Sequence, residues 1–110
     1  MSKDNQYYLS KTLEEIDTIL EYSQNLTILQ LQQQPIVLDA IIFRMVQMSE
    51  HMDKISDDYK ALHSEIEWLD IKGFRNRLVH DYGGVDLHFV YSAITEDIPK
   101  LRIQINALLI

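Results

Sequence analysis

The segment from position 75 to position 82 gathers the side chains best suited to chemistry: two arginines, an asparagine, a histidine and a tyrosine. A histidine exchanges protons near neutral pH, because its unperturbed pKa is about 6.5. The planar guanidinium of an arginine matches the oxygens of a phosphate group. Asn76 and His80 lie four residues apart, so on a helix their side chains can touch. These residues alone indicate a basic patch with one histidine, and most histidines on helices are structural or merely exposed.

The segment falls on a predicted helix that begins near residue 67 or 68 and ends at Gly83-Gly84. At about 100° per residue, Asn76, Arg77 and His80 gather on one side of this helix. The opposite side is a broad apolar arc of Trp68, Ile71, Phe74, Leu78, Val79 and Tyr82. Arg75 lies toward that arc, about 140° from His80. An arginine in such a place snorkels to the surface or meets a partner, such as a phosphate or a second protein chain.

Apolar residues at three- and four-residue spacing predict helices over most of the remaining chain. Pro35 suits the first turn of a helix, so we expect a connector over 30–34 before it. Ser56 and Asp86 are suited to cap the helices that follow them, and Pro99 is expected to kink the last helix near Asp97. Besides the helix described above, the expected helices cover residues 4–25, 35–54, 59–62 and 87–108.

Length and composition limit the fold class and the kind of partner. A chain of 110 residues with 46% hydrophobic residues fits one all-α domain, 1–110, with a real core. The segment 36–43 is apolar nearly all round, which predicts burial on more than one side. There is no cysteine, which excludes disulfides, thiol nucleophiles and thiolate metal sites. The net charge of −7 disfavours broad adhesion to nucleic acid, so RNA would need a local basic site, or a basic partner would cover part of the surface.

No segment approaches the length that spans a bilayer, and the first residues lack the apolar run of a signal peptide. We therefore expect a cytoplasmic protein with no membrane contact.

The segment 71–82 resembles the signature of the HEPN superfamily, and specifically its HepT-like branch. That signature is an arginine, four residues, a histidine, any residue and a tyrosine, here Arg75, His80 and Tyr82. The similarity extends to the segments 39–43, 49–50, 65–68, 84–86 and 97–99, so it covers most of the chain. One departure is Glu67, which stands where the family often has a proline. The resemblance implies a four- to five-helix HEPN-type bundle.

The resemblance also implies an activity, that of a metal-independent endoribonuclease toxin of a type VII-like toxin–antitoxin system. Its substrate would be RNA, with tRNA among the candidates, and no cofactor is expected. His80 would transfer the proton, Arg75 would clamp the phosphate or the transition state, and Asn76 would orient either of them. Lys72 and Arg77 would add positive potential for RNA, although a plain solvated face explains them equally well.

Two protein partners follow from the same resemblance. HEPN ribonucleases usually dimerise and bring two copies of the motif together, so we expect a symmetric homodimer through the helix over 35–54 and the motif helix. In HepT-like toxins the tyrosine of the motif is adenylylated by a cognate nucleotidyltransferase antitoxin of the MntA type. AMP on Tyr82 would repel RNA from a phosphate site. A core tyrosine whose hydroxyl reaches the surface is the compatible structural alternative.

Several residues keep two interpretations. Glu50 pairs with an arginine near the site or stays solvated, and the three methionines of 45–52 fill the core or a dimer interface. Three further histidines show no paired ligand spacing, so no metal site is expected; they are His51, His63 and His88. The alternative to the enzyme is a non-catalytic HEPN accessory or substrate-binding subunit of a nucleotidyltransferase. A helical interaction protein without nucleotide chemistry would leave the clustering of motif residues unexplained.

Overall fold

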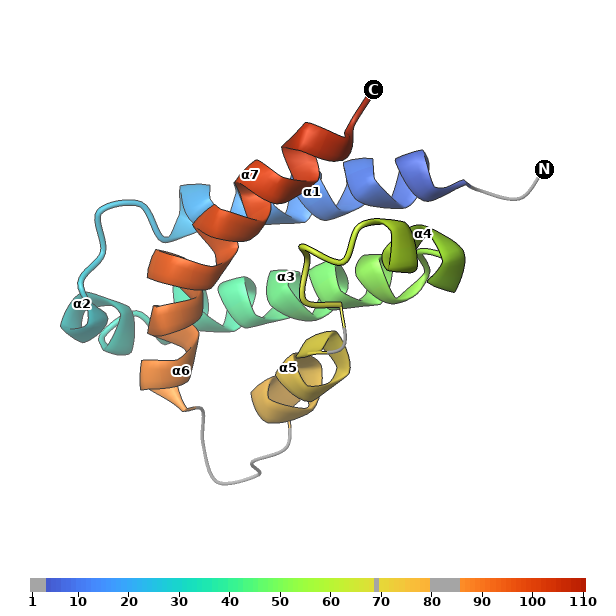
Figure 1. Ribbon diagram of the computed structural model, residues 1–110. Coiled ribbons are helices and arrows are strands. Elements are labelled where there is room, and N and C mark those ends of the chain that lie inside the picture. The colour runs from blue at the N-terminus through green and yellow to red at the C-terminus, as the bar shows by residue number, and fades with distance from the viewer. Residues whose placement is uncertain (1–3, 69, 80–85) are drawn as a thin grey trace.

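The computed structural model describes residues 4–68, 70–79 and 86–110, and within them it leaves aside the side chains of 70–72 and 79. Every regular element in these ranges is a helix, which confirms the predicted all-α class (Figure 1). In chain order the elements are α1 (Asn5–Tyr22), α2 (Ile28–Gln32), α3 (Pro35–Asp53), α4 (Asp57–Leu62), α5 (Asp70–Val79), α6 (Leu87–Ser92), the π-helical segment η1 (Ala93–Asp97) and α7 (Ile98–Leu108).

Helices α1 and α3 form the centre of the bundle and pack against each other (Figure 1). Helix α7 packs against α1, and α5 packs against α3. Segments α6, η1 and α7 follow one another without an intervening loop, and the short helix α2 contacts both α3 and α6. Helix α3 is therefore the support on which α5, the helix of the predicted motif, is held.

The core lies where these helices meet. Its buried residues are almost all aliphatic or methionine, and they include Leu9, Ile16, Ile19, Ile41, Met45, Met48, Met52, Ile66, Val90, Ile98 and Ile105. The three methionines of α3 are thus core residues, one of the two roles expected for them. Buried hydroxyls are satisfied within their own helices, as where Thr12 Oγ1 donates to the carbonyl of Tyr8 at 2.7 Å.

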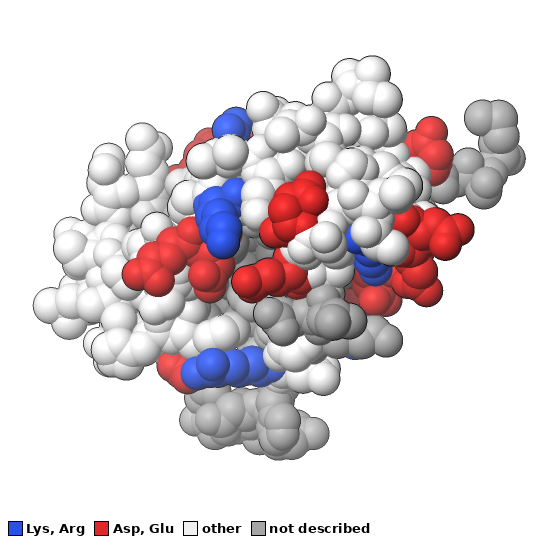
Figure 2. All heavy atoms as spheres, in the orientation of Figure 1, with Lys and Arg blue, Asp and Glu red and all other residues white. Residues whose placement is uncertain are grey.

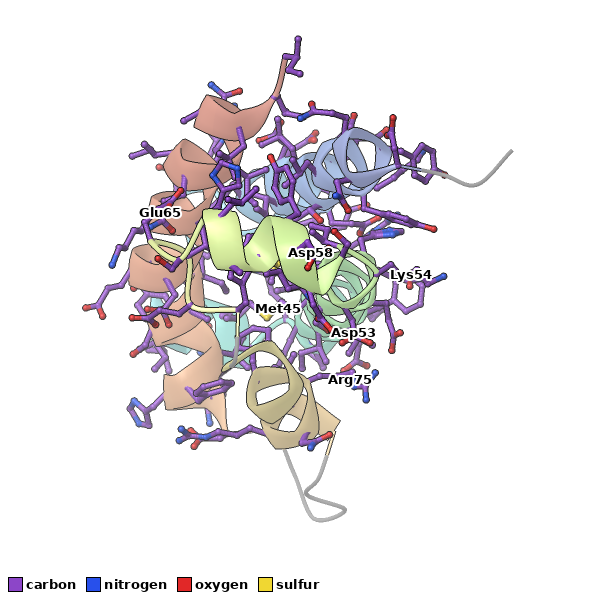
Figure 3. The ribbon with its side chains drawn as sticks, turned by 45° about the vertical axis from the view of Figure 1, so that its right-hand side comes forward. Met45, Asp53, Lys54, Asp58, Glu65 and Arg75 are labelled. Atoms are coloured by element: carbon purple, nitrogen blue, oxygen red, sulfur yellow. The ribbon has the colours of Figure 1, made fainter. Side chains whose placement is uncertain are left out.

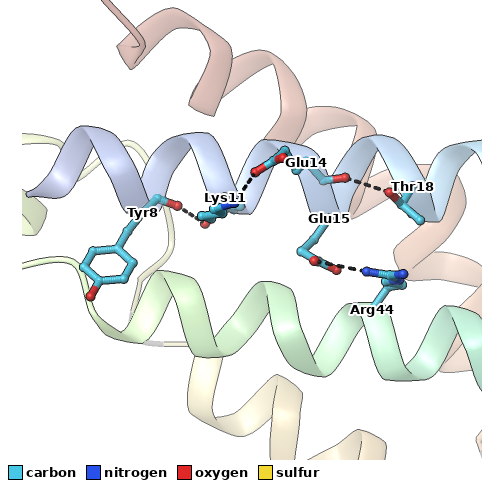
Figure 4. A network of polar contacts seen from close by, with 7 residues as sticks. Tyr8, Lys11, Glu14, Glu15, Thr18 and Arg44 are labelled. Carbon is cyan, nitrogen blue, oxygen red and sulfur yellow. Dashed lines mark hydrogen bonds and ion pairs between the residues drawn. The ribbon is translucent and has the colours of Figure 1, made fainter. Parts of the chain in front are cut away.

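Ion pairs on the outside of the core join the helices of the bundle. Arg44 Nη1 of α3 lies 3.4 Å from Glu15 Oε1 of α1 (Figure 4). On the other side of α1, Arg102 Nε of α7 donates to Asp17 Oδ1 at 2.7 Å. Such partly exposed pairs each contribute about 1 kcal/mol or less, so they fix the orientation of helices that apolar burial already holds together.

Local signals in the sequence place most helix ends correctly. Pro35 is the first residue of α3. The side chain of Ser56 accepts the backbone N–H of Tyr59 and caps α4, and that of Asp86 accepts the N–H of Phe89 and caps α6. Where a kink is expected before Pro99, the structure has the π-helical segment η1, in which the N–H of Ile98 donates five residues back to the carbonyl of Ala93. Proline lacks an N–H and its ring crowds the preceding turn, so the backbone there widens.

Four predicted boundaries differ from the structure by two residues or more. The first helix ends at Tyr22 rather than at residue 25, and the short helix α4 begins at Asp57 rather than at residue 59. The connector expected over 30–34 is largely the helix α2, because Thr27 and Gln30 form a reciprocal capping box that starts a helix inside a glutamine-rich segment. The motif helix begins at Asp70 rather than at residue 67 or 68. Trp68 stands in the turn before it, where its Nε1 donates to the carbonyl of His63 at 2.8 Å.

The sequence predicts that the apolar first half of α3 is buried on more than one side, and this prediction is wrong for the single chain. Ile36 is 84% exposed and Phe43 is 55% exposed, while Ile41 on the opposite side is fully buried. Residues 36, 40 and 43 follow the spacing of one helix face. The single chain therefore leaves a largely uncovered apolar stripe along α3, which we define as the exposed Ile36 and Phe43 with the half-buried Ala40 between them.

Candidate active site

Helix α5 holds the motif residues against α3 through its own apolar side. Leu78 is 7% exposed and belongs to the core cluster, and Phe74 packs on that cluster from a half-buried position. The Phe74 ring also meets the ring of Phe89 from α6, with 5.4 Å between the centroids. Aromatic and aliphatic contacts on two sides therefore fix the rotation of α5 about its axis, and with it the directions of Arg75, Asn76 and Arg77.

Arg75 projects toward α3 and forms an ion pair there (Figure 3). Its Nη1 donates to Glu50 Oε1 at 2.6 Å, a short distance typical of a charge-assisted hydrogen bond. The Arg75 side chain keeps 33% of its surface exposed and that of Glu50 keeps 41%. The awkward wheel position of Arg75 thus has an explanation within one chain. Of the two interpretations of Glu50, the paired one is observed.

Arg77 projects to another side of α5 and is held differently. Its Nη2 donates to Asp86 Oδ2 at 2.9 Å, and its guanidinium carbon lies 4.1 Å from the centroid of the Phe89 ring. The N–H of Phe89 and the Arg77 guanidinium both lower the pKa of Asp86 below its ordinary value, with the backbone hydrogen bond as the larger cause. Arg77 is therefore tied to the cap of α6 and does not join Arg75 in one basic patch.

The other predicted site residues are placed only in part. Asn76 lies on α5 with its side chain exposed to solvent. Lys72 also lies on α5, but its side chain is outside the described part of the chain. His80 and Tyr82 fall in the segment 80–85, which lies outside the described residues. Their roles remain predictions from the motif.

The further histidines do not assemble into a metal site. No three metal-binding side chains come together among the residues the structure describes. His51 is half-buried on α3, where burial lowers its pKa. His63 Nδ1 lies 3.6 Å from Glu65 Oε1 beside α4, and His88 is exposed on α6. In the same described ranges, none of the helices has the length and hydropathy needed to cross a membrane.

Glu50 is the residue whose importance the sequence left undecided. It stands 25 positions before Arg75 on a different helix, and only the packing of α5 on α3 brings the two together. Its spacing from the stripe residue Phe43 is seven, so both lie on one side of α3. The Glu50–Arg75 pair therefore lies on the same side of α3 as the uncovered apolar stripe, about two turns further along the helix.

Comparisons with known proteins place the chain in a family. Residues 12–108 match the sequence profile of the family described as ribonuclease HepT-like. A probable ribonuclease HepT of Thermococcus cleftensis is 29% identical over 102 residues, covering 93% of this chain and 93% of that protein. A protein named as a candidate RNase in Caldanaerobacter subterraneus subsp. tengcongensis is 24% identical, covering 93% of this chain and 91% of its own length.

A Methanocaldococcus jannaschii protein that combines a gamma-glutamylcyclotransferase with an RNase assignment is 30% identical over 96% of this chain, which spans 47% of that protein. No solved structure matches the chain significantly. The family match covers nearly the whole bundle, including α3 and α5 with the Glu50–Arg75 pair. The chain belongs to the HepT-like ribonuclease family of the HEPN superfamily.

Proposed function

We propose that this protein is a metal-independent endoribonuclease of the toxin type, which cleaves RNA, with tRNA among its candidate substrates. The observation that carries the proposal is Arg75 on α5, half-exposed and held by Glu50, within a chain that belongs to a ribonuclease family. A cation fixed in place before the substrate arrives stabilises charge on phosphorus without having to be reorganised during the reaction.

In this proposal one edge of the Arg75 guanidinium is held by Glu50 and the other edge binds the substrate. Only Nη1 of Arg75 bonds to Glu50, so the Nε–Nη2 edge has no partner among the described residues. That edge has the fork geometry that matches two phosphate oxygens. In the proposed reaction Arg75 binds the scissile phosphate, and Glu50 acts as a positioning residue that keeps the guanidinium at the right place on α5.

His80 supplies the proton transfer in this proposal. Its imidazole removes the proton of the ribose 2′-hydroxyl, whose oxygen attacks phosphorus, and the bond from phosphorus to the 5′-oxygen breaks. The leaving 5′-oxygen takes up a proton from solvent, and the His80 imidazolium returns its proton to solvent, so the step is neutral in protons overall. The products are one RNA fragment with a 2′,3′-cyclic phosphate and one with a 5′-hydroxyl. Asn76, exposed one residue after Arg75, orients His80 or the phosphate.

Binding of the RNA chain is assigned to Lys72 and Arg77. Both lie on α5, Lys72 three residues before Arg75 and Arg77 two residues after it, and add local positive potential to a protein whose net charge is −7. Asp86 offsets the charge of Arg77 at 2.9 Å, so the contribution of Arg77 is the smaller part of the proposal.

We further propose that the protein acts as a symmetric homodimer. The uncovered stripe of Ile36, Ala40 and Phe43 favours packing of a second copy on α3, next to the Glu50–Arg75 pair. Two motifs would then form one composite site. Phe43→Glu, at a 55% exposed position, should leave the fold intact and run as a monomer in size-exclusion chromatography with light scattering. An unchanged dimer would rule out this face of α3.

Regulation by a cognate nucleotidyltransferase antitoxin of the MntA type is proposed for Tyr82. The motif places this tyrosine two residues after His80. AMP attached to it would put a bulky negative charge beside the phosphate site and repel RNA. Mass spectrometry of the protein co-expressed with such a partner would detect the added AMP on the peptide that contains Tyr82.

The alternative is a non-catalytic HEPN subunit that presents a substrate to a nucleotidyltransferase. One observation favours it: Arg75 and Arg77, the two arginines of α5, are both paired with carboxylates, in an acidic chain. The two proposals separate on whether the unmodified protein cuts RNA.

The experiment is cleavage of total cellular RNA and tRNA in EDTA by the wild type, Arg75→Ala and His80→Ala. Mass spectrometry first verifies that Tyr82 carries no AMP, and circular dichroism verifies the helical fold of each variant. Cutting by the wild type that both substitutions abolish is the expected result. No cutting by the unmodified wild type would favour the accessory subunit.

A further inference from the structure

A pocket with a volume of about 530 Å³ opens beside α5 on the side of Gly73, Phe74 and Arg77. Its other walls come from α3, from the connector before α5, and from α6 and α7. Neither Arg75 nor Glu50 lines it, so the pocket is separate from the proposed phosphate site. Its volume lies within the range of pockets that hold small molecules or anchoring side chains.

The floor of the pocket is apolar. Met48, Met52, Ile66 and Ile98 belong to the buried core, and the rings of Phe74 and Phe89 add to the apolar lining. Methionine side chains adapt to the shape of an occupant. The space reaches the backbone of α5, because a Cβ added at Gly73 would meet nothing within 4 Å. An occupant would therefore need an apolar body.

The rim of the pocket carries an excess of negative charge. Glu65 and Glu67 come from the connector and Asp97 from the end of η1, against the two cations Arg77 and Lys100. The charge of Arg77 is already matched by Asp86, which leaves Lys100 against three carboxylates. Figure 2 shows acidic side chains on both sides of a basic one over this part of the surface.

The carboxylates of the rim are also available to bind a cation. Neither Glu67 nor Asp97 forms an ion pair with a described residue, and Glu65 meets only His63, which is charged only when protonated. The connector itself is anchored, because Gln104 Nε2 of α7 donates to the carbonyl of Glu65 at 3.0 Å. The rim therefore offers positioned acceptors above an apolar floor.

We propose that this pocket binds an arginine or lysine side chain presented by a partner protein. Such a side chain has an apolar stem that fits the floor and a cationic head that reaches the carboxylates of the rim. The net charge of −7 favours encounter with a basic surface. Contact with Gly73 and Phe74 places the bound partner on α5, at a pocket that neither Arg75 nor Glu50 lines. This inference is independent of whether the protein cleaves RNA.

The test uses hexylguanidinium as the probe and hexylurea as its uncharged counterpart of the same shape. Binding is followed by NMR from the methyl signals of Met48 and Met52, which line the floor. We expect hexylguanidinium to bind about fivefold more tightly than hexylurea, since each exposed charge contact adds a modest amount. The difference should shrink as the salt concentration rises, because exposed charges are screened.

Variants with opposite charge changes sharpen the test. The double variant Glu67→Gln, Asp97→Asn should weaken hexylguanidinium about fivefold and leave hexylurea unchanged, whereas Lys100→Gln should strengthen hexylguanidinium. The matched control Glu21→Gln, Asp58→Asn changes the net charge equally at exposed positions outside the pocket and should change neither affinity. Gly73→Leu should fill the open space and weaken both probes.

Three results would overturn the proposal. Equal binding of hexylguanidinium and hexylurea would show that the rim does not select a cation. Tighter binding of AMP, weakened by Lys100→Gln, would make this an anion or nucleotide pocket. Probe binding that Gly73→Leu leaves unchanged would place the probe elsewhere on the surface.

Discussion

Two arginines two residues apart on α5 are both paired with a carboxylate, yet the two pairs differ in what else they do. Asp86 also caps α6 by accepting the N–H of Phe89, and the guanidinium of Arg77 also covers the Phe89 ring. The Arg77–Asp86 pair is therefore part of how the chain begins α6. Glu50 lies in the last turn of the long helix α3, caps no helix, and forms no hydrogen bond or ion pair with a described residue other than Arg75. An ion pair that no local structure needs is the better candidate for a functional role.

Arg75 and Arg77 should differ most strongly when each arginine is replaced in turn. Arg75→Ala should lower the rate of RNA cleavage about 100- to 1000-fold, as expected when a positioned cation at the transition state is lost. Arg77→Ala should lower it only a few-fold, through weaker RNA binding. Single-turnover rates on one defined RNA give both numbers, and Arg75→Lys tests whether the planar fork is needed. Equal losses at the two positions would contradict the assignment.

Replacing Glu50 tests whether this carboxylate positions Arg75 for cleavage. Glu50→Ala should lower cleavage about tenfold, because an arginine displaced by about 1 Å is a poorer partner for the transition state. Glu50→Gln should lose less, since the amide oxygen still accepts from Nη1. Asp53→Ala, on the same helix and exposed, is the matched control; it removes the same charge and should leave cleavage unchanged or slightly raised. A gain of activity in Glu50→Ala would show that Glu50 blocks Arg75 rather than positions it.

Gly73 allows a test of α5 itself, without touching either pair. Gly73→Ala should stabilise the protein by roughly 0.5–1 kcal/mol, because alanine favours the helix and its Cβ has free space. Urea unfolding followed by circular dichroism measures the change. Cleavage should stay near the wild-type value, since the directions of Arg75 and Arg77 do not change. A destabilised Gly73→Ala would mean that the backbone of α5 is strained at this position.

The smallest expected effect is a pH dependence at Asp86. Its pKa is lower in the folded state than its ordinary value of 3.8, so its ionised form stabilises the fold above that pH, and the stabilisation is lost as the pH falls through the folded pKa. Asp86→Asn keeps a good capping residue but loses the charge. The urea midpoint of Asp86→Asn should lie below that of the wild type at pH 7. The two should converge in strongly acidic buffer, and a gap that persists there would show that charge is not the cause.

Features that depend on residues close together in the chain could be predicted from the sequence, whereas contacts between distant helices could not. Pro35, Ser56, Asp86 and Pro99 act within a few residues of their own positions, and each does what its residue type predicts. The helix α2 was missed because its capping box consists of common polar residues inside a glutamine-rich segment.

The same distinction between local features and contacts across helices applies to the candidate site. Helical periodicity shows that Arg75 points away from the polar side of α5. Its partner Glu50 lies on another helix, so the sequence left open whether Glu50 is paired or solvated, and only the packing of α5 on α3 shows that it is paired. The pocket beside Gly73 likewise depends on four separate segments. His80 and Tyr82 lie outside the described residues, and their roles rest on the motif.

The most direct test of the central claim is the chemistry of the RNA ends. Wild-type protein without AMP on Tyr82 is incubated with a defined RNA in EDTA, and the fragments are identified by mass spectrometry. Attack by the ribose 2′-hydroxyl predicts a 2′,3′-cyclic phosphate on one fragment and a 5′-hydroxyl on the other, with no cut where a 2′-deoxynucleotide replaces the attacking ribose. Intact RNA, or fragments that form only when a metal ion is added, would contradict a metal-independent ribonuclease centred on Arg75 and His80.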